Sequence, residues 1–210
     1  MRKLCLALGG GLVALALAAP LRAADPMDTA AYDLLFKEGT LDRFETGEAL
    51  RYRREVSNAL LPDAAARDTG EIVLSLDGGA PEKAQLKFVQ DGKHRGLGEF
   101  PASVGNPVIM YFVETVVRDM AESTGGSPYY IRNRVKEALI SPADITEADG
   151  VVTVVMHPFE GDPNAERMKG FGTLTMTVVM SEDAPGWYRS LGAEAGDTYG
   201  SQMVLEGLAE

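Results

Sequence analysis

The two histidines, His94 and His157, are the side chains in this sequence best suited to act as a general base near neutral pH. His94 lies in a charged turn between Lys93 and Arg95, and His157 directly precedes Pro158. Neither stands in an HxxxH, HxH or HExxH arrangement, and the chain has no G-x-S-x-G elbow and no G-x-x-x-x-G-K-[ST] phosphate loop. The sequence therefore predicts no catalytic residue. The alternative is a hydrolase that uses His157 or His94 as its base.

Metal and cofactor chemistry have no recognisable sequence pattern either. The only cysteine, Cys5, lies in the first 23 residues, so residues 24–210 contain no thiolate. A metal site would need both histidines to meet a carboxylate such as Glu99 or Glu160. The methionines fall mainly at apolar positions of expected helices and strands, where they fill a core. We therefore expect no metal and no cofactor.

Two segments combine residue types that often line binding sites. Residues 96–107 hold three glycines and two prolines and lead directly into an apolar helical pattern. Residues 124–134 join two expected helices and combine two tyrosines with two arginines. The interaction surface predicted from these segments comprises Asn106, Tyr129, Tyr130, Arg132 and Arg134. The structural alternative is a capped helical hairpin whose tyrosines pack on a sheet.

The first 23 residues have the layout of a bacterial-type secretory signal peptide. Arg2 and Lys3 precede an uncharged apolar run, and cleavage is expected after Ala23 or Ala24. The run is shorter than the roughly 20 apolar residues of a membrane span, although an uncleaved anchor is the alternative. We expect residues 24–210 to form a single periplasmic domain with no membrane span once the signal is removed.

The charge balance limits the classes of partner. The chain carries 20 Lys and Arg against 31 Asp and Glu, a net charge of −11 at pH 7. Removal of the cationic signal would make the balance more negative still. Such a surface repels phosphate polyanions and anionic bilayers, so nucleic acid is excluded as a partner. Solubility is the favoured explanation of the acidity, and a basic partner is the alternative.

Two amphipathic helices are the strongest local patterns in the chain. Asn106 and Pro107 form a cap and first turn before an apolar stripe with helical spacing. The stripe consists of Ile109, Phe112, Val113, Val116, Val117 and Met120. Gly125 and Gly126 end this helix, and Ser127 begins the next.

The remaining patterns indicate strands. Residues 48–56, 72–76, 84–88, 151–156, 173–180, 187–195 and 199–205 are expected strands, with a further short one at 144–146. Arg54 interrupts the apolar side of the first of them. The order of helix, strands, helix pair and strands predicts an α+β fold with an antiparallel sheet of about seven or eight strands, on which the helix pair packs.

This order of elements resembles that of the periplasmic lipoprotein carriers of the LolA and LolB type, with an N-terminal helix, a curved antiparallel sheet and helices on its concave face. The resemblance covers much of residues 24–210 and includes no sequence motif, so no family residue is carried over. It implies a half-open barrel whose apolar interior holds an acyl chain or another hydrophobic ligand.

We therefore expect a non-catalytic periplasmic binding or accessory protein. Its partner would be either a hydrophobic small molecule such as an acyl chain or an envelope protein. The apolar faces of the helix and strands supply the candidate ligand-binding residues, which are Phe88, Phe112, Val116, Met120, Met176 and Trp187.

Overall fold

The computed structural model describes residues 29–80, 82–141 and 143–209. The expected signal peptide, residues 1–23, lies outside this part of the chain. Within the described residues, no helix is long and apolar enough to cross a membrane.

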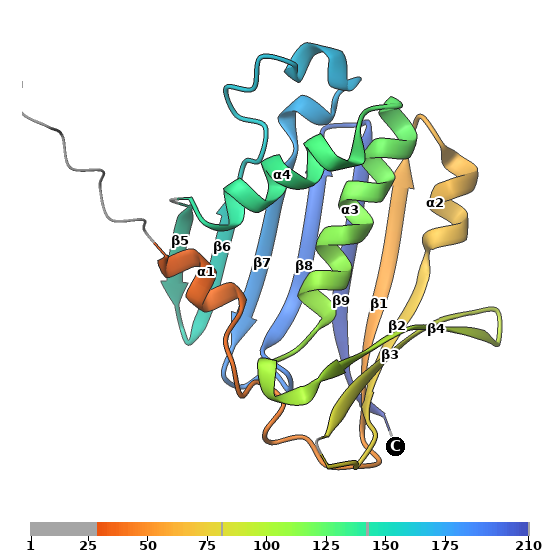
Figure 1. Ribbon diagram of the computed structural model, residues 1–210, viewed down its shortest axis with the longest axis vertical. Helices are drawn as coiled ribbons and strands as arrows, with labels where there is room; N and C mark the ends of the chain where they lie inside the picture. The colour runs from red at the N-terminus through yellow and green to blue at the C-terminus, as the bar shows by residue number, and fades with distance from the viewer. Residues whose placement is uncertain (1–28, 81, 142, 210) are drawn as a thin grey trace, which may run out of the picture.

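The described residues form one antiparallel sheet of nine strands in the order β4-β3-β2-β1-β9-β8-β7-β6-β5 (Figure 1). The first strand, β1, lies next to the middle strand of the sheet, and β2, β3 and β4 follow it outward to one edge. The other half ends with β9, which pairs with β1 along its whole length. In chain order the strands are β1 (Ala49–Asn58), β2 (Gly70–Leu76), β3 (Lys83–Gln90), β4 (Lys93–Pro101), β5 (Asp144–Ala148), β6 (Val151–Met156), β7 (Thr175–Ser181), β8 (Tyr188–Ala195) and β9 (Tyr199–Ala209).

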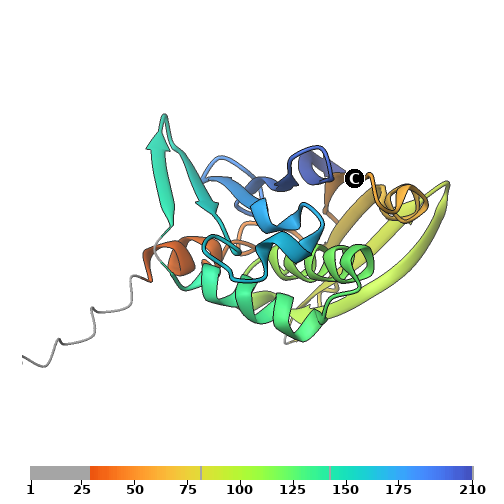
Figure 2. The ribbon, with the colours of Figure 1, turned by 90° about the horizontal axis from the view of Figure 1, so that it is seen from above.

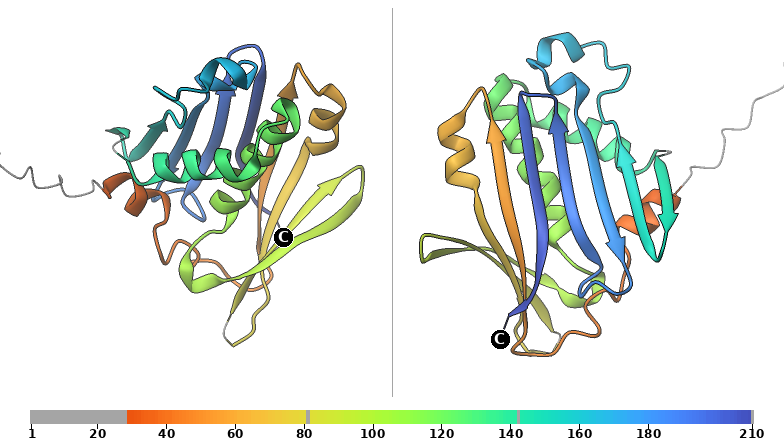
Figure 3. Two further views of the ribbon diagram at one scale, coloured as in Figure 1. Left: turned by 45° about the horizontal axis from the view of Figure 1, so that its top comes forward. Right: turned by 180° about the vertical axis from the view of Figure 1, so that it is seen from behind.

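The two long helices lie on one face of the sheet, and the views from above and from behind show the layering (Figures 2 and 3). The helices are α1 (Ala30–Leu35), α2 (Pro62–Asp68), α3 (Val108–Thr124) and α4 (Pro128–Leu139), with short 3₁₀ turns η1 (Ala102–Val104), η2 (Ala165–Met168) and η3 (Phe171–Thr173). On the opposite face, exposed and half-exposed ion pairs such as Arg51–Glu71 and Arg53–Glu206 cover the central strands.

Helix α3 fills the concave face of the sheet. The predicted apolar stripe is buried along its length, and Phe112 and Val116 are fully inaccessible to solvent. They pack in one continuous core with the inward residues of the strands, such as Leu50, Val178 and Met203. Burial of apolar surface is the main force that holds a helix on a sheet. The interior implied by the carrier resemblance is therefore occupied by side chains of the protein itself.

The predicted helix boundaries are confirmed by their hydrogen bonds. The Asn106 side-chain oxygen accepts from the backbone N–H of Val108 at 3.0 Å, as an N-cap does. Gly125 ends α3 in the left-handed conformation with a φ of 72°. The Ser127 hydroxyl then accepts from the N–H of Tyr130 at 3.4 Å and caps α4.

The α+β class and the open antiparallel sheet are confirmed, but the predicted strand count is too low. The additional strand is β4, which occupies much of the segment predicted to be a glycine-proline loop. Its residues are almost all exposed, so no alternation of apolar and polar side chains marks it. A register shift in its pairing with β3 accommodates the glycines.

Candidate functional site

An open pocket with a mainly apolar lining lies at the turn between α3 and α4. We call it the hairpin pocket; its volume is about 380 Å³, within the range typical of small-molecule sites. The floor consists of apolar side chains that belong to the buried core, and the rim is polar. The lining residues are Met120, Thr124, Gly125, Gly126, Ser127, Tyr130, Ile131, Asn164, Arg167 and Met168.

The far wall of the pocket is the lobe between β6 and β7, residues 157–174, which sits beside the helix pair (Figure 1). Met168 on η2 is buried against the core. Lys169 continues the wall and donates from Nζ to the backbone carbonyl of Ser123 at 3.1 Å. A cation is favourable there because the last carbonyls of a helix carry partial negative charge.

Asp162 ties the lobe to α4. Its carboxylate accepts hydrogen bonds from the Tyr130 hydroxyl at 2.7 Å and from Arg134 Nε at 2.8 Å. It also accepts from the backbone N–H of Asn164 at 2.7 Å. Burial of this carboxyl alone would raise its pKa, but the hydrogen bonds and the charge of Arg134 outweigh burial and leave the pKa below its ordinary value.

Replacing Asp162 with asparagine should lower the free energy of unfolding by about 1.5–3 kcal/mol near neutral pH, the usual worth of hydrogen bonds to a charged group. Because the folded pKa is depressed, this contribution is present above the unfolded pKa and is lost as the pH falls through the folded value. Thermal unfolding from pH 7 to pH 3 should therefore show the two proteins converging below about pH 4. Asp197→Asn, at an exposed position, is the control. If the difference in stability between the wild type and Asp162→Asn did not change with pH, the role of the Asp162 charge would be contradicted.

The six apolar residues predicted to bind a ligand are all buried, but the structure does not bring them to one pocket. Three of them, Phe112, Val116 and Met176, belong to the solvent-inaccessible core between α3 and the sheet. Met120 alone of the six lines the hairpin pocket. Phe88 lies beneath the guanidinium of Arg95, and the Trp187 indole donates to the carbonyl of Leu34 at 2.9 Å. Ligand binding by these residues stays a prediction.

The residues predicted to form an interaction surface have different surroundings. Asn106 is buried, which corrects its assignment to a surface, because its side chain bridges Tyr52 and the carbonyl of Gly186. Tyr129 is 71% exposed. The other three are tied down within the molecule: Tyr130 and Arg134 to Asp162, and Arg132 to Glu114 through paired hydrogen bonds.

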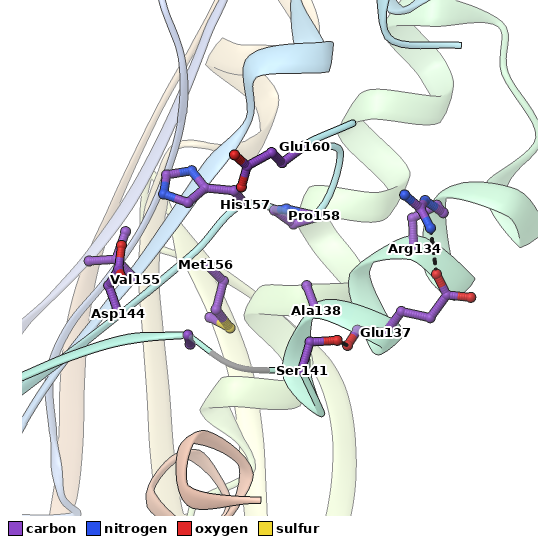
Figure 4. A pocket seen from close by; sticks show the side chains of 11 residues that line it. Arg134, Glu137, Ala138, Ser141, Asp144, Val155, Met156, His157, Pro158 and Glu160 are labelled. Atoms are coloured by element: carbon purple, nitrogen blue, oxygen red, sulfur yellow. Dashed lines mark hydrogen bonds and ion pairs between the residues drawn. The ribbon is translucent and has the colours of Figure 1, made fainter. Parts of the chain in front are cut away.

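His157 lines a separate pocket of about 340 Å³ between α4 and β6 (Figure 4). Its Nδ1 lies 3.2 Å from the Thr175 hydroxyl, which is not a carboxylate that could orient a base. The Ser141 hydroxyl, across the same pocket, donates to the backbone carbonyl of Glu137 at 2.6 Å. The pocket thus places a histidine and a serine together without the hydrogen bond that would activate the serine.

His94 lies far from His157 in the topology of the sheet. It belongs to β4, one edge strand, whereas His157 follows β6, next to the other edge. The arrangement needed for a metal site shared by both histidines is not formed. Among the described residues, no group of three or more His, Asp or Glu side chains could hold a metal ion.

Sequence reasoning missed the lobe that completes the hairpin pocket. Met168 and Asn164 come from short turns with no periodic pattern, so nothing local marks them as site residues. The signal that could have drawn attention to this segment is its concentration of glycine, proline and charged residues between two clear strands. Ile131 on α4 is buried in the core and lines the pocket.

Comparison with known proteins adds likenesses of architecture. The crystal structure of the Mycobacterium tuberculosis lipoprotein LppX matches 85% of this chain and 94% of its own, with 11% sequence identity and a TM-score of 0.30. A β-barrel-like protein from Brucella abortus, with a domain of unknown function, matches 77% of this chain and 96% of its own, at 10% identity and a TM-score of 0.25. No protein-family model and no curated protein matches the sequence.

Proposed function

We propose that this chain is a non-catalytic binding protein of the bacterial periplasm that holds an acyl chain in the hairpin pocket. The observation that carries the proposal is the division of the pocket into an apolar floor and a polar rim. Met120, Ile131 and Met168 supply the floor, and such side chains adapt to an irregular apolar ligand.

The rim suits an amphiphile, whose polar end must remain in water. Arg167 reaches the rim from η2, and its guanidinium makes no ion pair within the described chain. An acyl chain with an anionic end could therefore place its tail on the floor and its charge beside Arg167. Residues 1–23 have the composition of a signal that directs a protein across the inner membrane, which supports the periplasmic part of the proposal.

Native mass spectrometry of the protein isolated from its own host is the first test. We expect a mass that corresponds to a chain beginning after Ala23 or Ala24, together with an additional mass released by organic solvent. A fluorescent fatty acid should then bind the solvent-treated protein at a single saturable site. If the isolated protein carries no ligand and the probe does not bind, the acyl-carrier proposal is wrong, and docking of an envelope protein becomes the favoured function.

A filled pocket should abolish this binding. A Cβ on Gly126 would lie 3.0 Å from Oγ1 of Thr124 and 3.6 Å from Cδ1 of Ile131, two residues that line the pocket. Gly126→Leu should therefore fill part of the pocket and weaken probe binding at least tenfold, by displacing chain methylenes worth about 0.8 kcal/mol each. Gly96→Leu is the matched control, because a Cβ there meets no atom within 4 Å and Gly96 lies in β4, outside the pocket. Equal affinity of the two variants would place the ligand elsewhere.

A further inference from the structure

A third pocket, of different character, is lined by the turn between β3 and β4 and by the end of α2, elements that are labelled in Figure 1. We call it the β3–β4 pocket; its volume is about 280 Å³. Its lining includes Arg67, Lys93, His94 and Arg95, with Asp91 as the one acidic residue. A chain with 31 acidic and 20 basic residues does not gather cations in this way through its average composition.

Strand geometry explains why two of these cations share a face. Side chains alternate along β4, so Lys93 and Arg95 point to the same side of the sheet. Their cross-strand partners on β3 are Gln90 and Phe88, and Phe88 belongs to the core on the concave face. Lys93 and Arg95 therefore project toward the side of the sheet that carries α2.

The pocket is held in shape by contacts that do not need a ligand. Gln90 Nε2 donates to the backbone carbonyls of Ala66 at 2.9 Å and Thr69 at 2.7 Å, which fixes the end of β3 against α2. The Arg95 guanidinium lies over the Phe88 ring, 4.8 Å from its centroid. Stacking on a ring restrains the guanidinium while leaving its edge free for hydrogen bonds.

The nearby carboxylates engage Arg67 fully and Arg95 only loosely. Arg67 pairs with Asp68 at 2.9 Å and with Glu122 at 3.2 Å. Asp68 also pairs with Arg118 at 2.9 Å and lies 3.9 Å from Arg95, an ion pair too long for a hydrogen bond. The side chains of Lys93 and His94 make no hydrogen bond or ion pair with the described residues. The pocket therefore offers a guanidinium edge and an ammonium group with donors to spare.

We propose that the β3–β4 pocket binds a phosphate group, as free inorganic phosphate or as the phosphomonoester headgroup of a lipid. Cations that approach from α2 and from β4 suit a multivalent tetrahedral anion better than a single carboxylate. This site is separate from the hairpin pocket, shares no lining residue with it, and does not depend on the acyl-carrier function.

Isothermal titration calorimetry in a phosphate-free buffer of low ionic strength tests the proposal with two probes, inorganic phosphate and dihexanoyl phosphatidic acid. Saturable binding of either is expected. Lys93→Gln and Arg95→Gln should each raise the Kd about tenfold, as expected for the loss of one hydrogen bond between charged groups. Lys87→Gln is the matched control, because Lys87 is an exposed cation of the same hairpin on the opposite face.

The two probes separate the sources of the phosphate. Similar affinity for both indicates that the free ion suffices, and at least tenfold tighter binding of phosphatidic acid indicates a lipid headgroup; both results support the site. The proposal is overturned if neither probe binds, or if Lys87→Gln weakens binding as much as Lys93→Gln does, because that would show a diffuse charge effect. Lys93→Gln should keep the wild-type thermal midpoint, since Lys93 is exposed and makes no hydrogen bond or ion pair with the described residues.

Discussion

Replacing Asp119 with alanine is expected to lower the free energy of unfolding by about 3–5 kcal/mol, the cost of leaving a buried charge without its partner. That charge is Arg54, whose side chain is 0% exposed in the central strand β1. Its Nη2 lies 3.2 Å from Asp119 Oδ2, and neither Nε nor Nη1 has a hydrogen-bond partner among the described residues. Asp119 on α3 is thus the counter-ion that makes the buried arginine tolerable.

The surrounding groups strengthen the expectation. Tyr199 donates to the same Asp119 oxygen at 2.8 Å, and burial raises the pKa of its phenol well above the ordinary value, so it stays a donor. Arg118 reaches the other carboxylate oxygen at 2.8 Å. Alanine would remove the acceptor of all three donors at once, which is why the expected loss exceeds that of a surface ion pair.

Urea denaturation of a double-mutant cycle measures the effect. Asp119→Ala, Asp119→Leu and Arg54→Met should each destabilise the protein. The double variant Arg54→Met/Asp119→Leu, which closes the cycle with the two matching single variants, should recover most of the loss, because apolar replacements of a buried pair are often close to neutral. Glu147→Ala, at an exposed position of β5, is the control. A loss below 1 kcal/mol for Asp119→Ala would mean that water reaches Arg54 in solution.

Gly186→Ala should produce the next largest loss of stability, about 2–5 kcal/mol. Gly186 has a φ of 74°, a conformation that costs an L-residue about 1–2 kcal/mol. An added Cβ would also lie 2.5 Å from Cδ1 of Leu50 and 2.9 Å from Nδ2 of Asn106, and such overpacking costs about 1–3 kcal/mol more. The clash would disturb the hydrogen bond from Asn106 to the Gly186 carbonyl at 2.8 Å.

Gly150→Ala separates the two causes. Gly150 has nearly the same φ, 73°, but a Cβ there meets no atom within 4 Å. Gly150→Ala should therefore lower the free energy of unfolding only by the backbone cost of about 1–2 kcal/mol. Thermal and urea unfolding of both variants give the comparison. Equal losses would show that the packing around Gly186 relaxes without cost.

Local patterns were sufficient to predict the helix pair and most strands. The caps at Asn106 and Ser127, the stop at Gly125 and the apolar stripe of α3 are interactions between residues a few positions apart, so a short stretch of sequence contains all of them. β4 was missed because both of its faces are largely exposed, which removes the alternation that marks a strand.

The candidate site was predicted only in pieces. Met120 was expected in an internal cavity and Tyr130 on an interaction surface, and the structure places both on the hairpin pocket. What joins them is the lobe that carries Asp162, Asn164 and Met168, which reaches the helix pair from the far side of β6. Sequence periodicity does not predict this contact, because the lobe and the helix pair are far apart in the sequence.

The sequence by itself determined the α+β class, the helical hairpin, the absence of cysteine from residues 24–210 and the acidic surface, because these follow from composition and short-range spacing. Only the tertiary structure decided that β1 pairs with β9 at the centre of the sheet and that Arg54, an apparent break in an apolar face, meets Asp119 from α3. It also decided that the cations of α2 and β4 share one pocket. The physical reason is the same in each case: strand pairing, burial and ion pairing depend on distances in space, which chain position alone does not specify.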